Sequence, residues 1–296
     1  MATVRRPPPR TAPASDGRAL VRLTLLLVVL AGVLVPRGPA AAGLPADDVV
    51  PPIVAAYGQI GTLAVVVGHQ LSRGDGPGMG PRGHRTVGLI AHNGAAHRPF
   101  PTASMVKLFM AEDILYRNRT GEIRLDGTDF ALVQDMIRRS SDPAASVLWV
   151  RYGGGQLVDD VAARYDLPGT RPPAVPGEWG EATTTARDLA RFLALLPVVA
   201  HRFDAAALQV WMRTATTIAA DGFDQRFGLL AAAPPFTAVK QGWMCCVGGN
   251  RHLHSVGVVG HRIVVLLSEV PRRVGYDEAR AALTSAAAAV PPPPGF

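Results

Sequence analysis

The alternation of apolar and polar residues predicts β-strands near both ends of the chain. Thr62–Leu71 and Thr86–Asn93 have the short apolar pattern of strands, separated by a segment rich in glycine, proline and arginine. Three further strands are expected at Thr237–Cys246, Arg251–Val259 and Arg262–Val270. The short connections VGGN and GH between these three favour an antiparallel meander.

Between these strands the pattern becomes helical, with apolar residues three or four positions apart. The chain is also expected to carry a helix at each end of the domain, at Ala46–Gly61 and Asp277–Ala289. Leu167–Thr183 interrupts the helical block, because its prolines and glycines exclude regular structure. The expected helices of the block are Ser104–Tyr116, Phe130–Arg139, Ala144–Tyr152, Gln156–Tyr165, Thr185–Leu196 and Ala205–Ala215.

This order predicts an α+β fold, in which an antiparallel sheet is built from both ends of the chain and a helical subdomain is inserted between the sheet halves. With 296 residues and 48% hydrophobic composition, the chain can bury one large core. The domain is expected to span residues 43–290, followed by a disordered tail at 291–296. A cleft is expected where the helical block meets the sheet.

The first 42 residues have the pattern of a secretory leader. Arginines surround Leu23–Val35, an apolar run, and small residues follow at Ala40–Ala42. This run is too short to span a bilayer, which takes roughly 20 residues. The sequence therefore predicts a signal peptide, with an uncleaved N-terminal anchor as the alternative. No cysteine stands close behind this run, since the two cysteines are at positions 245 and 246, and this argues against a lipid anchor. Both cases place the protein outside the cytoplasm, secreted or in the cell envelope.

The basic charge of the chain is largely a property of this leader. The net charge falls from +7 to +2 when residues 1–42, with six arginines and one aspartate, are left out. The chain also lacks arginine clusters with interleaved aromatic residues, so nucleic-acid binding is not expected. We expect no cofactor, no metal and a monomer, with no membrane contact beyond the N-terminal anchor.

The rarity of lysine in this chain draws attention to Lys107. Lys107 and Lys240 are the only lysines among the 30 Lys and Arg residues. Lys107 follows Ser104 by three residues in a predicted helix, which brings the two side chains together. A buried lysine can lose its proton and activate a serine hydroxyl, whereas arginine stays protonated. The free backbone N–H groups of a helix start can also bind an oxyanion.

Two further short motifs strengthen this interpretation. Ser141 and Asp142 follow within RRSSDPAAS, and Lys240 precedes Gly242 on a predicted strand, where the glycine leaves room for a substrate backbone. The order Ser-x-x-Lys, Ser-Asp and Lys-x-Gly resembles the signature of class A β-lactamases and D-alanyl-D-alanine peptidases. The resemblance extends over essentially the whole of residues 43–290.

The resemblance implies a serine hydrolase of the β-lactamase fold. Ser104 would be the acylated nucleophile and Lys107 its base partner. Ser141 would relay a proton to the leaving nitrogen, and Lys240 would hold the substrate carboxylate. The substrates would be peptidoglycan stem peptides with D-Ala-D-Ala ends, β-lactams or simple esters.

The resemblance also implies a set of contacts to the substrate. The backbone N–H groups of Ser104 and Trp243 would form the oxyanion hole. Trp243 is also expected to wall the cleft, while the other three tryptophans are expected in the core. The residues expected to contact substrate are Asp142, Gln241, Gly242 and Trp243.

Two departures from the family pattern concern substrate binding. Pro143 stands where the family has asparagine after Ser-Asp, so an amide contact is lost. The register Ser140-Ser141-Asp142 would instead place an acid at that position, and we favour the register that begins at Ser141. Gln241 stands where the family has Thr or Ser, so a hydroxyl that binds the substrate carboxylate becomes a longer amide.

A third departure concerns release of the acyl group. Class A enzymes carry a glutamate that activates water, and this position falls near Gly169 in the sequence. Glu178 and Glu181 would serve only if the loop ran differently. An acyl-enzyme at Ser104 is therefore expected to persist, which predicts peptidase-like or weak hydrolytic activity. The alternative is a catalytically impaired cell-wall-binding or interaction module that keeps the fold.

The two cysteines of the chain are adjacent on a predicted strand. The side chains of Cys245 and Cys246 should therefore point to opposite faces, and a bond between them would be strained. Buried thiols beside the cleft are the favoured interpretation. The alternatives are a strained or regulatory disulfide, and a metal site in which a cysteine joins His252 and His254.

Overall fold

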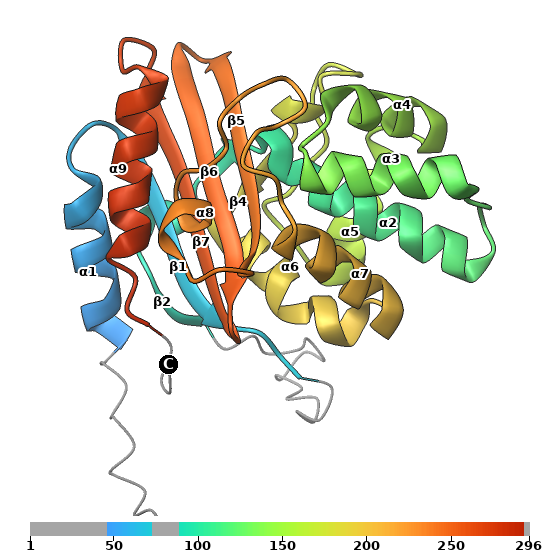
Figure 1. Ribbon diagram of the computed structural model, residues 1–296, viewed down its shortest axis with the longest axis horizontal. Coiled ribbons are helices and arrows are strands. Elements are labelled where there is room, and N and C mark those ends of the chain that lie inside the picture. Colours follow the sequence, from blue (N-terminus) through green and yellow to red (C-terminus); the bar gives the residue numbers. More distant parts are fainter. Residues whose placement is uncertain (1–45, 73–88, 293–296) are drawn as a thin grey trace, which may run out of the picture. The chain divides into compact units, whose positions relative to one another are not determined.

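A five-stranded antiparallel sheet takes its strands from both ends of the chain, as the sequence predicts (Figure 1). Strand β1, from the N-terminal side, pairs along its length with β7, and β5 lies at one edge. The spatial order is β2-β1-β7-β6-β5. The strands are β1 (Thr62–His69), β2 (Leu89–His92), β5 (Ala238–Val247), β6 (Asn250–Val259) and β7 (Arg262–Pro271).

The structure, a computed structural model, describes residues 46–72 and 89–292. The predicted leader, the first residues of the second predicted strand and the end of the predicted tail lie outside the described residues. All of the described residues belong to one compact unit, and every contact given below lies within it. No helix in the described part of the chain is long and apolar enough to cross a membrane.

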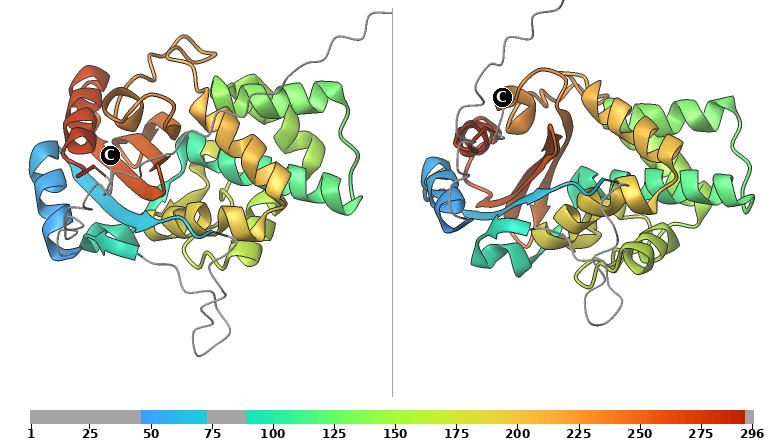
Figure 2. Two further views of the ribbon diagram at one scale, coloured as in Figure 1. Left: turned by 60° about the horizontal axis from the view of Figure 1, so that its bottom comes forward. Right: turned by 90° about the horizontal axis from the view of Figure 1, so that it is seen from below.

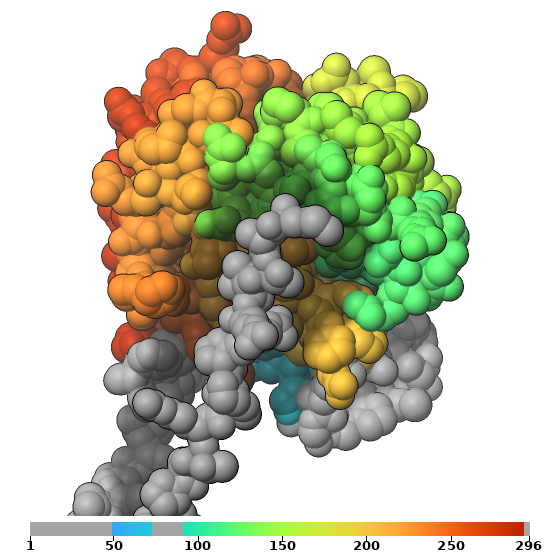
Figure 3. All heavy atoms as spheres, turned by 45° about the vertical axis from the view of Figure 1, so that its right-hand side comes forward, coloured from blue at the N-terminus to red at the C-terminus, as the bar shows by residue number. Residues whose placement is uncertain are grey.

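Helices cover both faces of the sheet. The first and last helices, α1 (Ala46–Tyr57) and α9 (Tyr276–Ala288), lie side by side on one face (Figures 1 and 2). The larger helical part packs on the other face, and its green residues form much of the surface in Figure 3. It contains α2 (Val106–Thr120), α3 (Gly127–Arg138), α4 (Asp142–Tyr152), α5 (Gln156–Tyr165), α6 (Ala186–Val199) and α7 (Arg202–Arg213), and short α8 (Leu229–Ala232) precedes β5.

The alternation of side chains along β5 decides which residues reach the helical part. Ala238 lies in the core beneath the helical part, and Val239 lies in the core beneath α1 and α9. Lys240 comes two positions after Ala238, so the two-residue period of a strand directs it toward the helical part. The edge strand therefore delivers a lysine to the side of the sheet on which α2 begins.

A small second sheet, not predicted from the sequence, brings the irregular loop to the start of α2. Strand β3 (Pro99–Pro101) pairs with β4 (Thr183–Thr185), and Thr102 N–H donates to the carbonyl oxygen of Ala182 at 2.7 Å. Strands of three residues are too short to show a period in the sequence. Their pairing places the 3₁₀-turn η3 (Trp179–Glu181) beside the residues that precede α2.

Candidate active site

Ser104 lies in a short 3₁₀-turn, η2 (Ala103–Met105), that leads directly into α2. Its hydroxyl oxygen accepts a hydrogen bond from Lys107 Nζ at 3.0 Å. Ser104 is 4% exposed and Lys107 is 0% exposed. The structure therefore brings the predicted nucleophile and base into direct contact, away from bulk water.

Acceptors and an aromatic ring enclose the amine of Lys107. Its Nζ donates to the carbonyl oxygen of Ser140 at 2.7 Å and to Asp142 Oδ1 at 2.5 Å. The indole of Trp179 lies over the amine, with its ring centre 4.8 Å from Nζ. Burial lowers the pKa of Lys107 below its ordinary value, and the opposing charge of Asp142 only partly offsets this effect. The amine therefore loses its proton more readily than an exposed lysine would.

The hydroxyl of Ser140 connects the two lysines. Lys240 Nζ donates to Ser140 Oγ at 2.8 Å, and Lys107 Nζ lies 3.4 Å from the same oxygen. Lys240 Nζ also donates to the carbonyl oxygen of Gln241 at 2.7 Å, and Lys240 is 1% exposed. Burial, followed by the nearby charge of Lys107, lowers the pKa of Lys240 well below its ordinary value. Both lysines can therefore exchange protons through one hydroxyl.

The sequence predicts Ser141 at this shared position, but the structure places Ser140 there. The hydroxyl of Ser141 instead caps α4 by accepting a hydrogen bond from Ala144 N–H at 3.3 Å. Ser140 has a φ of 52°, in the left-handed region, which lets its side chain face the lysines while the next residue starts the helix. The motif therefore begins at Ser140 and has Asp142 as its third residue.

Alanine substitutions separate the roles of the two serines. Ser140→Ala removes the hydroxyl between the lysines, and it should lower the rate of Ser104 acylation by roughly a hundredfold or more. Ser141→Ala should leave that rate nearly unchanged and lower the free energy of unfolding by about 1 kcal/mol, the usual loss for an N-cap serine. Burst kinetics with an activated ester and urea unfolding measure the two effects. If Ser141→Ala slowed acylation and Ser140→Ala did not, the relay role would belong to Ser141.

Close packing holds the backbone around Ser104 in an unusual conformation. Ala103 has a φ of 46°, a region that residues with a side chain rarely adopt. A Cβ atom added at Gly242 would lie 3.2 Å from the backbone nitrogen of Ser104 and 2.9 Å from the side chain of Met105. Gly242 therefore lets β5 approach η2 itself, whereas the sequence suggests that it makes room for substrate. Strained residues of this kind collect at functional sites.

Gln241 does not present its amide to the cleft. Its Nε2 atom donates to the carbonyl oxygens of Gln225, at 3.2 Å, and of Phe227, and the residue is 1% exposed. The alternation of β5 explains this orientation, because Gln241 follows Lys240 and so points to the opposite face of the sheet. The predicted substrate contact by this side chain is therefore not supported by the geometry.

Trp243 lines the cleft, as predicted, although its ring is already engaged. The indole stacks on Phe223 with ring centres 4.5 Å apart, and its Nε1 donates to Asp221 at 3.3 Å. Trp243 belongs to β5, which lies at the edge of the sheet formed by the described residues. Its backbone is therefore the part suited to the predicted oxyanion contact.

A cleft of about 240 Å³ opens at Ser104 between η2, α4, the irregular loop and β5. The loop reaches it through Gly177, Glu178, Trp179 and Gly180. Trp179 was not expected here, since the sequence pattern places it in the core. The only feature of the sequence that could have indicated this position is that Trp179 stands among glycines in an irregular loop. The lining residues are Ala103, Ser104, Asp142, Gly177, Glu178, Trp179, Gly180, Trp243 and Met244.

Gly169, near which the sequence comparison places the family's deacylating glutamate, is not among the described residues that line the cleft. Its backbone N–H donates to Asp188 near the start of α6 at 2.8 Å, and a Cβ added there would meet the side chain of Thr185. Glu178 lines the cleft, whereas Glu181 is exposed and does not. The loop therefore places one acid near Ser104, at a different point of the sequence.

Cys245 and Cys246 are bonded to each other, and neither is buried. The expectation of buried thiols is therefore wrong, and the disulfide alternative describes the structure. The pairing of β5 with β6 is irregular between Cys245 and Val247, so the simple alternation of a strand does not hold at these residues. Since both sulfur atoms are engaged, Cys245 does not join His252 and His254 in a metal site. No group of metal-binding residues occurs in the described part of the chain.

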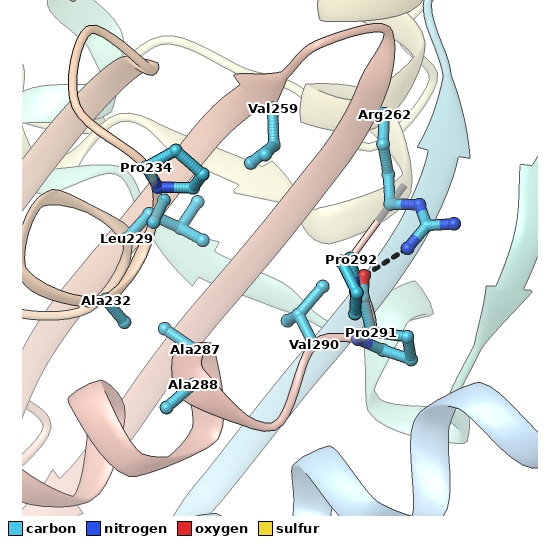
Figure 4. Close-up of a pocket in the computed structure, with 11 residues that line it drawn as sticks. Leu229, Ala232, Pro234, Val259, Arg262, Ala287, Ala288, Val290, Pro291 and Pro292 are labelled. Carbon is cyan, nitrogen blue, oxygen red and sulfur yellow. Dashed lines mark hydrogen bonds between the residues drawn. The ribbon is translucent and has the colours of Figure 1, made fainter. Parts of the chain in front are cut away.

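A second cavity, of about 160 Å³, lies on the opposite face of the sheet between α8, the end of α9 and the β6–β7 turn (Figure 4). Leu229, Val259 and Val290 are among its apolar lining residues. Arg262 is the one charged residue in the described lining, and its guanidinium donates to the carbonyl oxygen of Pro291. The described lining of this cavity holds no serine, threonine or cysteine that could act as a nucleophile.

Comparison with known proteins gives one group of sequence relatives. The chain is 35% identical over 209 residues to "Putative lipoprotein LppW" of Mycobacterium tuberculosis and to the protein of the same name from Mycobacterium bovis. The match covers 68% of this chain and 65% of each relative, so the chain spans just under two thirds of their length. No family model matches the chain.

Solved β-lactamase structures align with nearly the whole folded unit. A class A β-lactamase from Bacteroides cellulosilyticus aligns with a TM-score of 0.63, over 83% of this chain and 97% of that one, at 14% identity. A β-lactamase from Burkholderia vietnamiensis aligns with a TM-score of 0.60, over 80% and 93%, at 19% identity. The chain has the class A β-lactamase fold. A fold does not by itself determine a reaction, so a function has to be argued from the side chains around Ser104.

Proposed function

We propose that the chain is an exported serine hydrolase that forms an acyl-enzyme at Ser104 and releases it slowly. Its substrates are D-Ala-D-Ala ends of peptidoglycan stem peptides, β-lactams or simple esters. One observation carries the proposal: the buried amine of Lys107, with its lowered pKa, lies 3.0 Å from the hydroxyl oxygen of Ser104. The class A β-lactamase fold supports it.

In the proposed reaction, the neutral amine of Lys107 accepts the proton of Ser104 while Ser104 Oγ attacks the substrate carbonyl. The bond between Oγ and the acyl carbon forms, the bond to the leaving group breaks, and the leaving group takes a proton through Ser140. The backbone N–H groups of Ser104 and Trp243 stabilise the oxyanion. Lys107 donates to Ser104 in the structure, so the amine must first lose one proton, which burial favours.

The composition of the cleft supports slow release of the acyl group. Gly169 supplies no carboxylate, and Trp179 covers the amine of Lys107 on the side of the loop. Glu178 lines the cleft but is exposed, and its carboxylate has no hydrogen-bond partner among the described residues that would orient it toward a water. A general base needs such an orientation. We therefore expect the acyl-enzyme to persist, as in penicillin-binding peptidases.

Asp142 should control the pH at which Lys107 becomes an active base. Its carboxylate favours the protonated amine and so raises the pKa of Lys107. Asp142→Asn removes this charge and so lowers the pKa of Lys107. In a plot of the acylation rate against pH, the rise on the acidic side (the acidic limb) should therefore move to lower pH. At pH values below the limb, the rate should rise roughly fivefold, since a half-exposed ion pair contributes about 1 kcal/mol. An unchanged limb in rapid-quench kinetics would show that Lys107 is not the titrating base.

A cell-wall-binding module without turnover is the second candidate function. Gln241 turns away from the cleft, and the amine of Lys240 is enclosed by Ser140 and a backbone carbonyl. Both features make the expected binding of a substrate carboxylate weaker. The Ser104–Lys107 pair favours the hydrolase, because a binding module gains nothing from burying an amine that destabilises the fold.

The location outside the cytoplasm is also a proposal. It is supported by the leader pattern of residues 1–42 and by the name of the relatives, "Putative lipoprotein LppW". The two cysteines of this chain are at positions 245 and 246, so the chain itself offers no cysteine near the leader for a lipid. Fractionation of cells that express the chain tests the location, and recovery in the cytoplasm would contradict it.

Labelling with a fluorescent penicillin and a fluorescent activated ester tests the proposed hydrolase. The purified protein should take up label on incubation and lose it slowly after dilution into unlabelled buffer, and Ser104→Ala should take up none. Rapid loss of label would indicate efficient turnover and contradict the slow release. A lack of Ser104-dependent label with both reagents would favour the binding module.

A further inference from the structure

The charged side chains around the cleft are predominantly acidic. Asp142 and Glu178 line it, and no lysine, arginine or histidine is among the described lining residues. Asp221 lies behind the cleft wall, where it accepts a hydrogen bond from the indole of the lining residue Trp243 at 3.3 Å. Two carboxylates therefore line the cleft at the candidate nucleophile and a third lies behind its wall, an arrangement that attracts a cationic group more than an anionic one.

The cations near the cleft do not offset the charge of Glu178. Lys107 is buried and paired with Asp142, and burial lowers the pKa of the enclosed Lys240 well below its ordinary value. Arg139 is paired with Asp135 at the surface. The side chain of Glu178 is exposed, and its carboxylate makes no hydrogen bond or ion pair with the described residues, so its negative charge is available to a ligand.

From this arrangement, and resting on the proposed acyl-enzyme function, we infer that the cleft selects acyl donors whose acyl chain ends in an ammonium group over those whose acyl chain ends in a carboxylate. Glu178 is the specificity-determining residue, because its charge is unpaired and it lines the cleft that contains Ser104. Trp179, the next residue of the loop, lines the same wall, but its ring already contacts the amine of Lys107. The carboxylate of Glu178 is therefore the group that attracts an ammonium ion.

Three p-nitrophenyl esters of matched chain length test the inference with the purified protein. Their acyl chains end in trimethylammonium, in the uncharged isostere tert-butyl, or in carboxylate. In each reaction the acyl carbon bonds to Ser104 Oγ, the ester bond to p-nitrophenol breaks, and the serine proton leaves through Lys107. The burst of p-nitrophenol reports acylation alone, so any effect of Glu178 on release of the acyl group does not enter the measurement.

The acylation rate should be about tenfold higher for the ammonium ester than for the carboxylate ester, with the uncharged ester between them, because an exposed carboxylate attracts one and repels the other by about 1 kcal/mol or less. High salt should reduce the difference. Glu178→Gln should reduce it to about threefold or less, leaving the contributions of the other two carboxylates. Glu181→Gln, on the same turn but outside the cleft, should leave the difference intact.

The outcomes separate this inference from the function on which it rests. Ser104-dependent bursts with equal rates for the three esters, or fastest with the carboxylate ester, would overturn the charge preference and leave the acyl-enzyme intact. A preference that survives Glu178→Gln unchanged would overturn the role of Glu178. No Ser104-dependent burst with any of the esters would overturn both the hydrolase and the inference.

Discussion

Replacing Lys107 with methionine should lower the rate of Ser104 acylation by roughly a thousandfold, because it removes the general base. Methionine keeps an unbranched chain of similar length, so the packing of α2 against η2 is preserved. Lys107 is fully buried, and burying a thioether in place of an amine removes a desolvation penalty. The variant should therefore be folded and at least as stable as the parent protein.

Lys107→Arg is the matched control for this prediction. Arginine keeps the positive charge but stays protonated, so it should be as inactive as methionine if the lysine acts as a base. If the lysine acts only through its charge, arginine should retain activity where methionine does not. Burst kinetics with an activated ester measure the rate, and thermal unfolding reports whether each variant is folded. Acylation of a folded methionine variant at the parent rate would place the base elsewhere.

Replacing Arg164 with methionine should lower the free energy of unfolding by about 3–5 kcal/mol above neutral pH, since it leaves buried carboxylates without their partner. Arg164, on α5, donates to Glu112 and, at 2.6 Å, to Asp113, both on the helix that carries Lys107. Glu112 is 3% exposed and Asp113 is 0% exposed. Tyr165 adds a hydrogen bond from its hydroxyl to Glu112 at 3.0 Å. The network fastens the active-site helix to α5.

The effect of Arg164→Met should grow as the pH rises. Burial raises the pKa of Glu112 from 4.5 to about 7, so the folded protein holds a proton that the unfolded chain releases. The stability contributed by this group is complete below the unfolded value and is lost as pH rises through about 7. The positive charge of Arg164 lowers the pKa of Glu112, so its removal enlarges the loss at alkaline pH and matters less at acidic pH.

Arg139→Met provides a control with a surface ion pair. Arg139 is 51% exposed at its side chain and pairs with Asp135 one turn away, so its loss should change the free energy of unfolding by about 1 kcal/mol or less. Urea unfolding of both variants at acidic and alkaline pH measures the difference. If the two variants lost equal free energy of unfolding, or if the loss in Arg164→Met did not depend on pH, the buried network would not be what stabilises α2 against α5.

The class of fold could be predicted from the sequence because apolar residues recur at regular spacing in most of its helices and strands. The strands β1, β5, β6 and β7 and the helices of the inserted part have apolar residues at the spacing that each structure requires. Short elements without a period were missed, among them the pairing of β3 with β4 that carries the loop to the cleft. A three-residue pairing depends on contacts between distant segments, which a local pattern does not contain.

The contact between Ser104 and Lys107 was predictable because helical spacing determines it, whereas the position of Ser140 was not. A single left-handed φ decides which of two neighbouring serines faces the lysines, and serine gives no signal for that conformation. The orientation of Gln241 follows from alternation along β5, once Lys240 is placed on the helical side. Trp179 and Glu178 reach the cleft through an irregular loop, whose path depends on tertiary contacts.

The central claim is that Ser104 carries the acyl group, and peptide mapping by mass spectrometry tests it most directly. The protein is incubated with a penicillin or an activated ester, quenched in acid and digested. We predict an adduct of the mass of the acyl group on the peptide that contains Ser104, persisting after excess reagent is removed and absent in Lys107→Met. An adduct on another residue, or an unmodified Ser104 peptide under conditions in which the reagent is consumed, would contradict the account.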